Sequence, residues 1–277
     1  MNLVLALRTV AVLYVLVAVA SVIHLVRPAR LAARTIAAAL GATACAHLVV
    51  LVARGVQAGG LPITNLHDDF SMFSFVAASL SSILALRTKV QQVAPLSALL
   101  IAALMMAVFT AEPTESVPAT LRSGWLPVHI ACAFLGNALF LMAGLVSIVF
   151  LVQERRLKGK KARWVPSGPD RLPPLETLDQ VSVRLIQMGF PLLTIGLMTG
   201  ALYGREFWGT YWIWDARNTL SLLIWLLYAL LLHFRITIGW RGRRLALLTL
   251  AGVVATLVSM VGLNLAQVGT HGKDFLL

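Results

Sequence analysis

Apolar residues fill eight long windows of the chain, and short polar segments separate these windows. A helix that crosses the hydrocarbon core of a bilayer, which is roughly 30 Å thick, needs about 20 predominantly apolar residues. The windows comprise residues 3–26, 35–52, 70–86, 94–110, 126–153, 181–203, 219–234 and 245–266. This pattern predicts an all-α integral membrane protein with eight transmembrane helices.

The composition agrees with a membrane protein, but the net charge first needs an explanation. Of the 277 residues, 59% are hydrophobic and 12% are charged, and an ordinary soluble domain has about twice that charged share. Most soluble folds are therefore excluded. A formal net charge of +12 would indicate a nucleic-acid partner in a soluble protein, so the positions of the basic residues become decisive.

The basic residues lie mainly on one side of the predicted bundle. One alternating set of loops holds sixteen of the 23 Lys and Arg residues, whereas the other set together with the termini holds six. Short loops rich in Lys and Arg stay in the cytoplasm, so both termini are predicted to face outward. The net positive charge is then explained by the orientation of the chain in the membrane, and we expect no binding of nucleic acid.

These observations predict a simple organisation. We expect one polytopic membrane domain over residues 1–277, with a basic cytoplasmic loop at 154–174 and an external loop at 204–218. The expected location is the bacterial cytoplasmic membrane, where lipid surrounds the spans.

Common catalytic and metal motifs are absent from the sequence. Cys45 and Cys132 lie within predicted helices and are not spaced as a redox or metal pair. The chain has no CxxCH, no Gly-rich phosphate loop, no HExxH and no serine nucleophile elbow. Covalent attachment of haem to this chain and the usual hydrolase mechanisms are therefore not expected.

The predicted external loop contains a dense aromatic cluster. Five aromatic residues fall within residues 207–214, and the segment that carries the chemistry consists of Trp208, Gly209, Tyr211, Trp212, Trp214 and Asp215. An interfacial belt of Trp and Tyr is one explanation, but belts place fewer rings at a helix end. The alternative is a platform for a large, flat, apolar ligand. Asp215 is expected to cap the seventh helix.

Two histidines flank this loop on the predicted outer side. His129 lies just inside the fifth helix, and His271 lies a few residues beyond the eighth. Each alone is compatible with an ordinary interfacial histidine. Together with flat aromatic walls, two imidazoles are what a bis-histidine haem site requires.

Two further histidines lie within spans. His233 lies near the inner end of the seventh helix, roughly 24 Å below the outer face, whereas His47 in the second helix is only about 10 Å deep. Unless the helices are strongly offset, these two side chains do not bind one metal together. For His233, ligation and snorkelling toward the headgroups stay open, and His47 is either a weaker ligand candidate or a packing residue.

Several stretches resemble one known family. The WGTYWIWD run at 208–215 resembles the WWD signature of haem-handling proteins in cytochrome c maturation. Further stretches that resemble the CcsA/ResC subunit of the system II cytochrome c synthase are PITNL at 62–66, LPPLETLD at 172–179, and GFPLLT at 189–194 followed by Gly200. His129 and His271 match the two external histidines of that family, and His233 matches its transmembrane histidine.

The chain also departs from the CcsA/ResC pattern. The Asp215-Ala216-Arg217 sequence is more similar to the CcmC type, a haem exporter with typically six spans. HemX-like regulatory membrane proteins share the fold and size without an established synthase role. A transporter for another solute is the remaining alternative.

The resemblance implies a haem-handling role as a subunit of a cytochrome c haem lyase. Haem b, iron protoporphyrin IX, would enter from the cytoplasmic side at His233, with a second ligand from a ResB/CcsB-like membrane subunit. His129 and His271 would then bind the iron at the outer site, against the 208–215 platform. There the CxxCH motif of an apocytochrome c would receive the haem through thioether bonds, and the chain would act chiefly by positioning.

Overall fold

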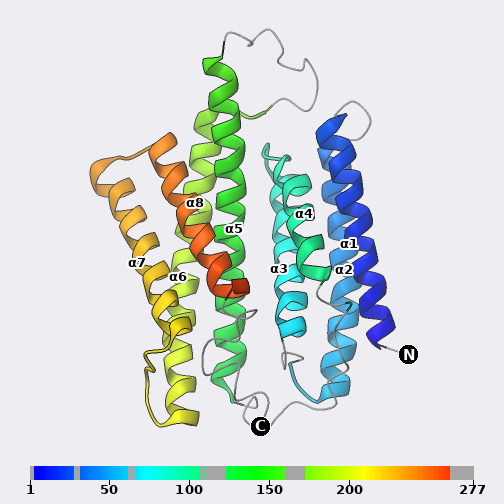
Figure 1. Cartoon of the computed structure of the whole chain (residues 1–277), viewed down its shortest axis with the longest axis vertical. Helices are drawn as coiled ribbons and strands as arrows, with labels where there is room; N and C mark the ends of the chain where they lie inside the picture. Colours follow the sequence, from blue (N-terminus) through cyan, green and yellow to red (C-terminus); the bar gives the residue numbers. More distant parts are fainter. Residues whose placement is uncertain are drawn as a thin grey trace. The chain divides into compact units, whose positions relative to one another are not determined.

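The computed structural model describes residues 3–27, 32–61, 66–106, 109, 123–159 and 172–262 (Figure 1). These residues form eight α-helices and two short π-helical segments. The elements are α1 Leu3–Val26, α2 Ala33–Ala58, α3 Leu66–Arg87, α4 Val93–Met106, α5 Trp125–Lys158, α6 Leu175–Trp208, α7 Ala216–His233, η5 Phe234–Ile238, α8 Arg243–Leu257 and η6 Val258–Gly262. The predicted all-helical class is confirmed.

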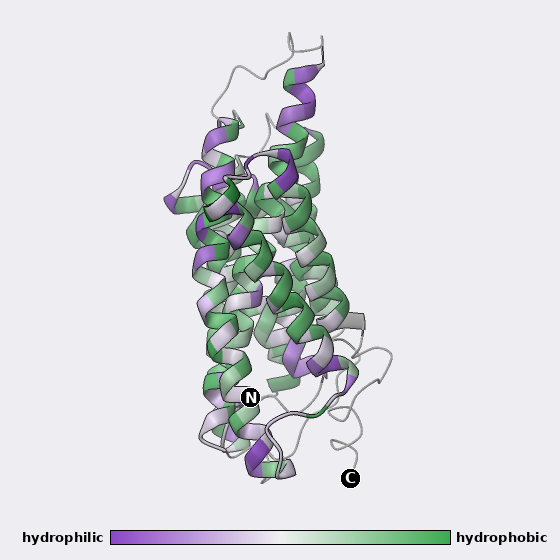
Figure 2. Ribbon diagram, turned by 90° about the vertical axis from the view of Figure 1, so that its left-hand side faces the viewer, coloured by the Kyte–Doolittle hydropathy of each residue, from purple (hydrophilic) through white to green (hydrophobic). Residues whose placement is uncertain are grey.

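Within the described part of the chain, seven helices are long and apolar enough to cross a membrane. Hydrophobic residues cover the middle of the helices, and hydrophilic residues gather toward their ends (Figure 2). Helix α4 is not one of these seven helices, because its 14 residues would span only about 21 Å. The window predicted for it ends at residue 110, but residues 107, 108 and 110 lie outside the described part. A multi-pass membrane protein is thus confirmed, whereas the count of eight spans and the outward termini stay predictions.

Helix ends differ from the hydropathy windows. Helix α6 begins six residues before its predicted window and continues through Pro191 to Trp208. Helix α5 likewise runs to Lys158, where the side chain pairs with Glu154 at 2.7 Å. Hydropathy reports the part of a helix that lies in lipid, whereas a helix continues into water as long as its residues favour it. The irregular part of the predicted 204–218 loop is therefore residues 209–215.

The chain divides into two compact units. Unit 1 comprises Met1–Val117 and Ile148–Leu178, and unit 2 comprises Pro118–Ser147 and Asp179–Leu277.

Helices α1 to α4 form the bundle of unit 1, in which α2 packs on α3 and α1 packs on α4. Large side chains that are fully buried fill its core: Tyr14, Leu40, Phe73, Ile101 and Met105. Small residues let the helices approach closely, because Ser82 donates a 2.8 Å hydrogen bond to the Ala37 carbonyl beside Gly41. Such contacts between small residues favour helix association in lipid.

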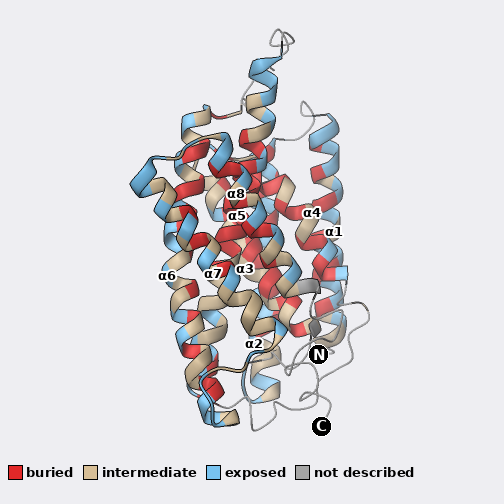
Figure 3. Cartoon of the chain, turned by 60° about the vertical axis from the view of Figure 1, so that its left-hand side comes forward, coloured by how far each residue is buried: buried red, intermediate tan, exposed pale blue. Residues whose placement is uncertain are grey.

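Unit 2 contains the first part of α5, most of α6, and the segment from α7 to η6. Its core centres on Phe140 and Tyr228, whose rings stack with a centroid distance of 3.7 Å and an interplanar angle of 11°. A Cβ atom on Gly252 would lie 2.8 Å from the Tyr228 ring, and one on Gly144 would lie 2.6 Å from Val253. Buried residues occupy the interior faces of these helices (Figure 3), so the interior of unit 2 is densely filled.

Candidate functional site

His129 lies in the second turn of α5, against the glycine-rich face of α6. Its Nδ1 atom is 2.7 Å from the carbonyl oxygen of Gly196. A carbonyl oxygen only accepts hydrogen bonds, so Nδ1 must carry the hydrogen and donate it. The ring also covers Gly200, where a Cβ atom would lie 2.8 Å from Cε1 and Nδ1 of His129. The imidazole is therefore held by hydrogen bonding at one nitrogen and by close packing.

The start of α5 is fastened to the end of α6. Ser123 donates a 2.5 Å hydrogen bond to the Glu206 carboxylate, and the Trp125 backbone N–H donates to the Ser123 hydroxyl at 3.2 Å. Gly200 precedes Trp208 by eight residues, or about 12 Å of helix. His129 and the aromatic loop that follows α6 thus lie at the same end of unit 2, as the sequence predicts.

The aromatic rings do not form one flat surface. Trp208 meets Tyr203 edge to face at 83°, and Trp212 meets Trp214 at 70°. Tyr211 receives a hydrogen bond from Arg205, whose guanidinium carbon lies 4.6 Å from its ring centroid. These rings offer several walls at steep angles to one another.

The loop itself is defined by its two ends. Gly209 ends α6 with a φ of +71°, a left-handed conformation that favours glycine. Asp215 accepts a 2.7 Å hydrogen bond from the Asn218 backbone N–H and caps α7, which confirms that prediction. Between them Trp214 is 76% exposed. An aromatic side chain this accessible, at the same end of unit 2 as His129, can contact an apolar ligand.

His233 has a different environment, because its side chain is exposed on the last turn of α7. Its Nδ1 atom lies 3.4 Å from the Thr237 hydroxyl. The same helix face carries exposed Leu223, Leu226 and Leu230, at the three- and four-residue spacing of one helical stripe. His233 therefore points away from the core of unit 2.

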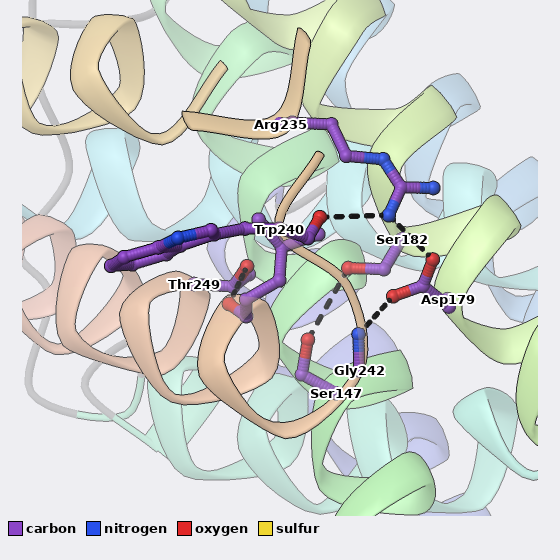
Figure 4. Close-up of polar contacts among 8 residues, drawn as sticks. Ser147, Asp179, Ser182, Arg235, Trp240, Gly242 and Thr249 are labelled. Atoms are coloured by element: carbon purple, nitrogen blue, oxygen red, sulfur yellow. Dashed lines mark hydrogen bonds and ion pairs between the residues drawn. The ribbon is translucent and has the colours of Figure 1, made fainter. Parts of the chain in front are cut away.

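A buried ion pair holds the segment that follows His233 (Figure 4). One oxygen of Asp179 pairs with Arg235 at 2.9 Å, and the other accepts the Gly242 backbone N–H at 2.8 Å. Arg235 also donates to the Trp240 carbonyl at 3.0 Å. The α7–α8 connection is thereby fastened to the first turns of α6, and the nearby hydroxyls of Ser147 and Ser182 lie 3.2 Å apart.

His47 is completely buried in unit 1, and both of its ring nitrogens have partners. Nδ1 lies 3.3 Å from the Tyr14 hydroxyl and Nε2 lies 2.9 Å from the Ser71 hydroxyl. Phe75 contacts the ring edge to face, with a centroid distance of 6.0 Å. Neither nitrogen is available to a metal in this arrangement, which favours the packing role over ligation.

His271 lies outside the described residues. Among the residues that the structure does describe, no group of three or more His, Cys, Asp or Glu side chains is arranged to hold a metal ion.

Sequence inspection missed two features of the site. The carbonyl of Gly196 and the bare backbone of Gly200 hold His129, and the spacing of Gly196, Gly200 and Gly204 was the available signal. The Asp179–Arg235 ion pair was also missed, since most of α6 and the whole of α7 separate the two residues along the chain.

The chain is similar to known proteins over most of its length. The sequence model of the family described as Cytochrome C assembly protein matches residues 64–271. A cytochrome c biogenesis protein CcsA from Synechococcus elongatus is 36% identical over 80% of this chain and 82% of its own length. CcsA proteins of Microcystis aeruginosa and Synechocystis are 32% and 31% identical, over 84% and 86% of this chain and 86% and 88% of their own lengths.

Proposed function

The chain belongs to the cytochrome c assembly protein family and acts in cytochrome c biogenesis, and we propose that it binds haem b at His129 and presents it to apocytochrome c. The observation that carries this proposal is the hydrogen bond between His129 Nδ1 and the Gly196 carbonyl. Histidines that bind a metal through one nitrogen almost always donate the other N–H to an acceptor such as a backbone carbonyl.

The surroundings of His129 fit a haem. Exposed Trp214 and Tyr211 supply apolar walls at the same end of unit 2, and Arg205 beside Tyr211 supplies a positive charge for a propionate. His271, the second external histidine of the resemblance, would hold the iron together with His129. Haem, when bound, would supply the vinyl groups for thioether bonds, and Trp208, Gly209, Trp212 and Asp215 with the rest of the loop would orient it.

His233 would receive haem before it reaches His129. Its exposed position on α7 supports a site that is completed by another chain, and a ResB/CcsB-like membrane subunit is the proposed source of the second ligand. The chain would lie in the bacterial cytoplasmic membrane, with both termini on its outer side. Its contribution to thioether formation is positioning, as a subunit of a cytochrome c haem lyase.

Haem binding by purified variants tests this proposal. We expect the chain, co-expressed with a CcsB-like subunit, to show a low-spin bis-histidine spectrum that His129→Ala reduces by more than about tenfold in haem affinity. His47→Ala is the matched control, because it removes a buried histidine whose nitrogens are both satisfied within unit 1. Equal haem content in the wild type and the His129→Ala variant would refute the proposal.

Haem delivery without bond formation is the second candidate function. The Asp215-Ala216-Arg217 sequence, which resembles exporters of the CcmC type, favours it. Reconstitution with an apocytochrome that carries CxxCH separates the two functions, since only a synthase subunit yields covalent haem that acid–acetone cannot extract.

A further inference from the structure

Two backbone positions of α6 determine how His129 can act. We propose that the Gly196 carbonyl and the side-chain-free Gly200 are positioning groups that fix the tautomer and the orientation of His129, so that Nε2 is presented to the iron. This inference rests on the proposed function, because it assigns the atom of His129 that would bind haem.

The tautomer follows from the hydrogen bond. The Gly196 oxygen is 2.7 Å from Nδ1 of His129, and only an Nδ1–H can occupy that contact. In a neutral imidazole the lone pair is then on Nε2. Within the described part of the chain, Nδ1 is the one nitrogen of this ring with a hydrogen-bond partner, in contrast to His47.

Gly200 makes this orientation possible, since the His129 ring lies where a side chain would begin. A Cβ atom at residue 200 would be 2.8 Å from both Cε1 and Nδ1 of His129, which is closer than atoms in contact approach. The ring would have to rotate or move away from the carbonyl. A glycine in a helix interior is less favourable than an alanine, and the close contact with His129 explains why glycine is tolerated at residue 200.

The Thr199 hydroxyl also lies within hydrogen-bond distance of the Gly196 carbonyl, at 3.1 Å, and of the Ile195 carbonyl, at 2.8 Å, so that its single hydrogen is shared between the two acceptors. The acceptor of His129 is thus fixed within a network of α6 itself, and its position does not depend on the aromatic loop. His129 is consequently oriented before any ligand binds.

The first experiment examines the chain without haem. With ¹⁵N-labelled histidine, and with the His129 signal assigned by its loss in His129→Gln, we expect nitrogen shifts of an Nδ1–H tautomer or an imidazolium. A neutral Nε2–H tautomer in the wild type would overturn the inference. This measurement needs no variant at residue 200, so it holds even if such a variant fails to fold.

The second experiment is a haem titration of Gly200→Ala. We expect haem affinity at the His129 site to fall about 10–100-fold, as for other groups that orient a metal ligand, with a shift from a low-spin to a partly high-spin spectrum. Gly124→Ala is the control, since a Cβ atom there would meet nothing within 4 Å. Unchanged affinity in a folded Gly200→Ala variant would refute the positioning role.

The two proposals fail in different ways. If His129→Ala keeps its haem, the proposed function itself is wrong. If His129→Ala loses haem and folded Gly200→Ala binds it as tightly as the wild type, only the positioning inference is wrong. Binding that involves His233 should be unaffected by Gly200→Ala, and it provides an internal reference in the same sample.

Discussion

His47 in unit 1 is completely buried and His129 in unit 2 is partly buried against α6, and the two also differ in the partner of one ring nitrogen. The hydroxyls of Tyr14 and Ser71 contact the two nitrogens of His47. In His129 the Gly196 carbonyl binds Nδ1, and this is its one hydrogen bond among the described residues. A buried polar group is costly unless it is paired. The pairing of His47 is complete, whereas that of His129 leaves a nitrogen for a ligand.

The difference extends to the neighbours of the two rings. His47 is surrounded by side chains that donate or accept according to the tautomer, so its own chemistry is used for packing unit 1. His129 contacts backbone of α6, which cannot change its donor or acceptor character. A candidate ligand is therefore recognised better by the kind of partner it has than by its burial. The following changes separate the two units by stability and by haem binding.

The largest loss of stability is expected from the buried carboxylates, one in each unit. Asp179→Ala removes the partner of Arg235 and the acceptor for Gly242 in unit 2, and Asp68→Ala removes the partner of Arg54, 2.6 Å away, in unit 1. Leaving one half of a buried ion pair costs about 3–5 kcal/mol. Unfolding by sodium dodecyl sulfate in mixed micelles, followed by circular dichroism, measures both.

The two carboxylate variants are expected to differ in haem binding. Asp179 holds the α7–α8 connection beside His233, so its loss should also lower haem binding that involves His233, whereas Asp68→Ala should leave haem per folded molecule unchanged. Removing Arg235 as well, in Asp179→Ala/Arg235→Leu, should restore part of the stability. If the double variant is no more stable than Asp179→Ala, the ion pair is not the source of the loss.

The second change replaces His47 and His129, in turn, by phenylalanine. His47→Phe leaves the Tyr14 and Ser71 hydroxyls without this partner, which is expected to cost about 1–3 kcal/mol of folding free energy. Haem per folded molecule should stay at the wild-type value. His129→Phe is expected to do the reverse, with a smaller effect on unfolding and loss of the outer haem spectrum. Loss of haem in His47→Phe at a normal folded fraction would contradict the distinction between the two sites.

The sequence was sufficient for the all-helical membrane class, but not for the contacts that distinguish one candidate ligand from another. The apolar runs predict eight spans, because lipid imposes a length on each helix, and seven helices of the described residues are long and apolar enough to cross a membrane. The end of α5 at Lys158 did not follow, since charged residues outside the bilayer extend a helix without changing hydropathy. Histidine is recognisable as a residue type, whereas a backbone acceptor such as the Gly196 carbonyl is not.

The partners of His47 show the same limit. Tyr14 and Ser71 are separated from it by 33 and 24 residues along the chain, on two other helices. No periodicity within the second helix identifies them. Ligation and packing therefore stayed open for His47 until three helices were placed together.

The third change compares how tightly the helices pack in each unit. Gly252→Ala in unit 2 would place a methyl 2.8 Å from the buried Tyr228 ring, which is stacked on Phe140, and overpacking of this kind costs about 1–3 kcal/mol. Gly41→Ala in unit 1 would meet the Ser82 hydroxyl at 2.5 Å.

The two glycine sites should differ because their neighbours differ. The Ser82 hydroxyl can rotate away at the cost of its hydrogen bond to Ala37, which is about 1 kcal/mol. The Tyr228 ring is completely buried and stacked on Phe140, so it cannot move aside. We expect Gly252→Ala to lower the unfolding midpoint more than Gly41→Ala. Equal midpoints would show that the core of unit 2 is as adaptable as that of unit 1.

The smallest effects are expected at helix starts, where the two units again differ. Asp215 caps α7 through the Asn218 N–H, whereas Ala32 occupies the same position of α2 with an extended backbone and no side-chain cap. Asp215→Ala should therefore cost about 1 kcal/mol, and Ala32→Ser should gain a similar amount. Asp215→Asn keeps a capping oxygen and is the control, so a loss as large as that of Asp215→Ala would indicate that the carboxylate charge matters more than the cap. Because Ala32 already has the backbone conformation of a cap, a gain of stability there would show that α2 lacks only the side-chain oxygen.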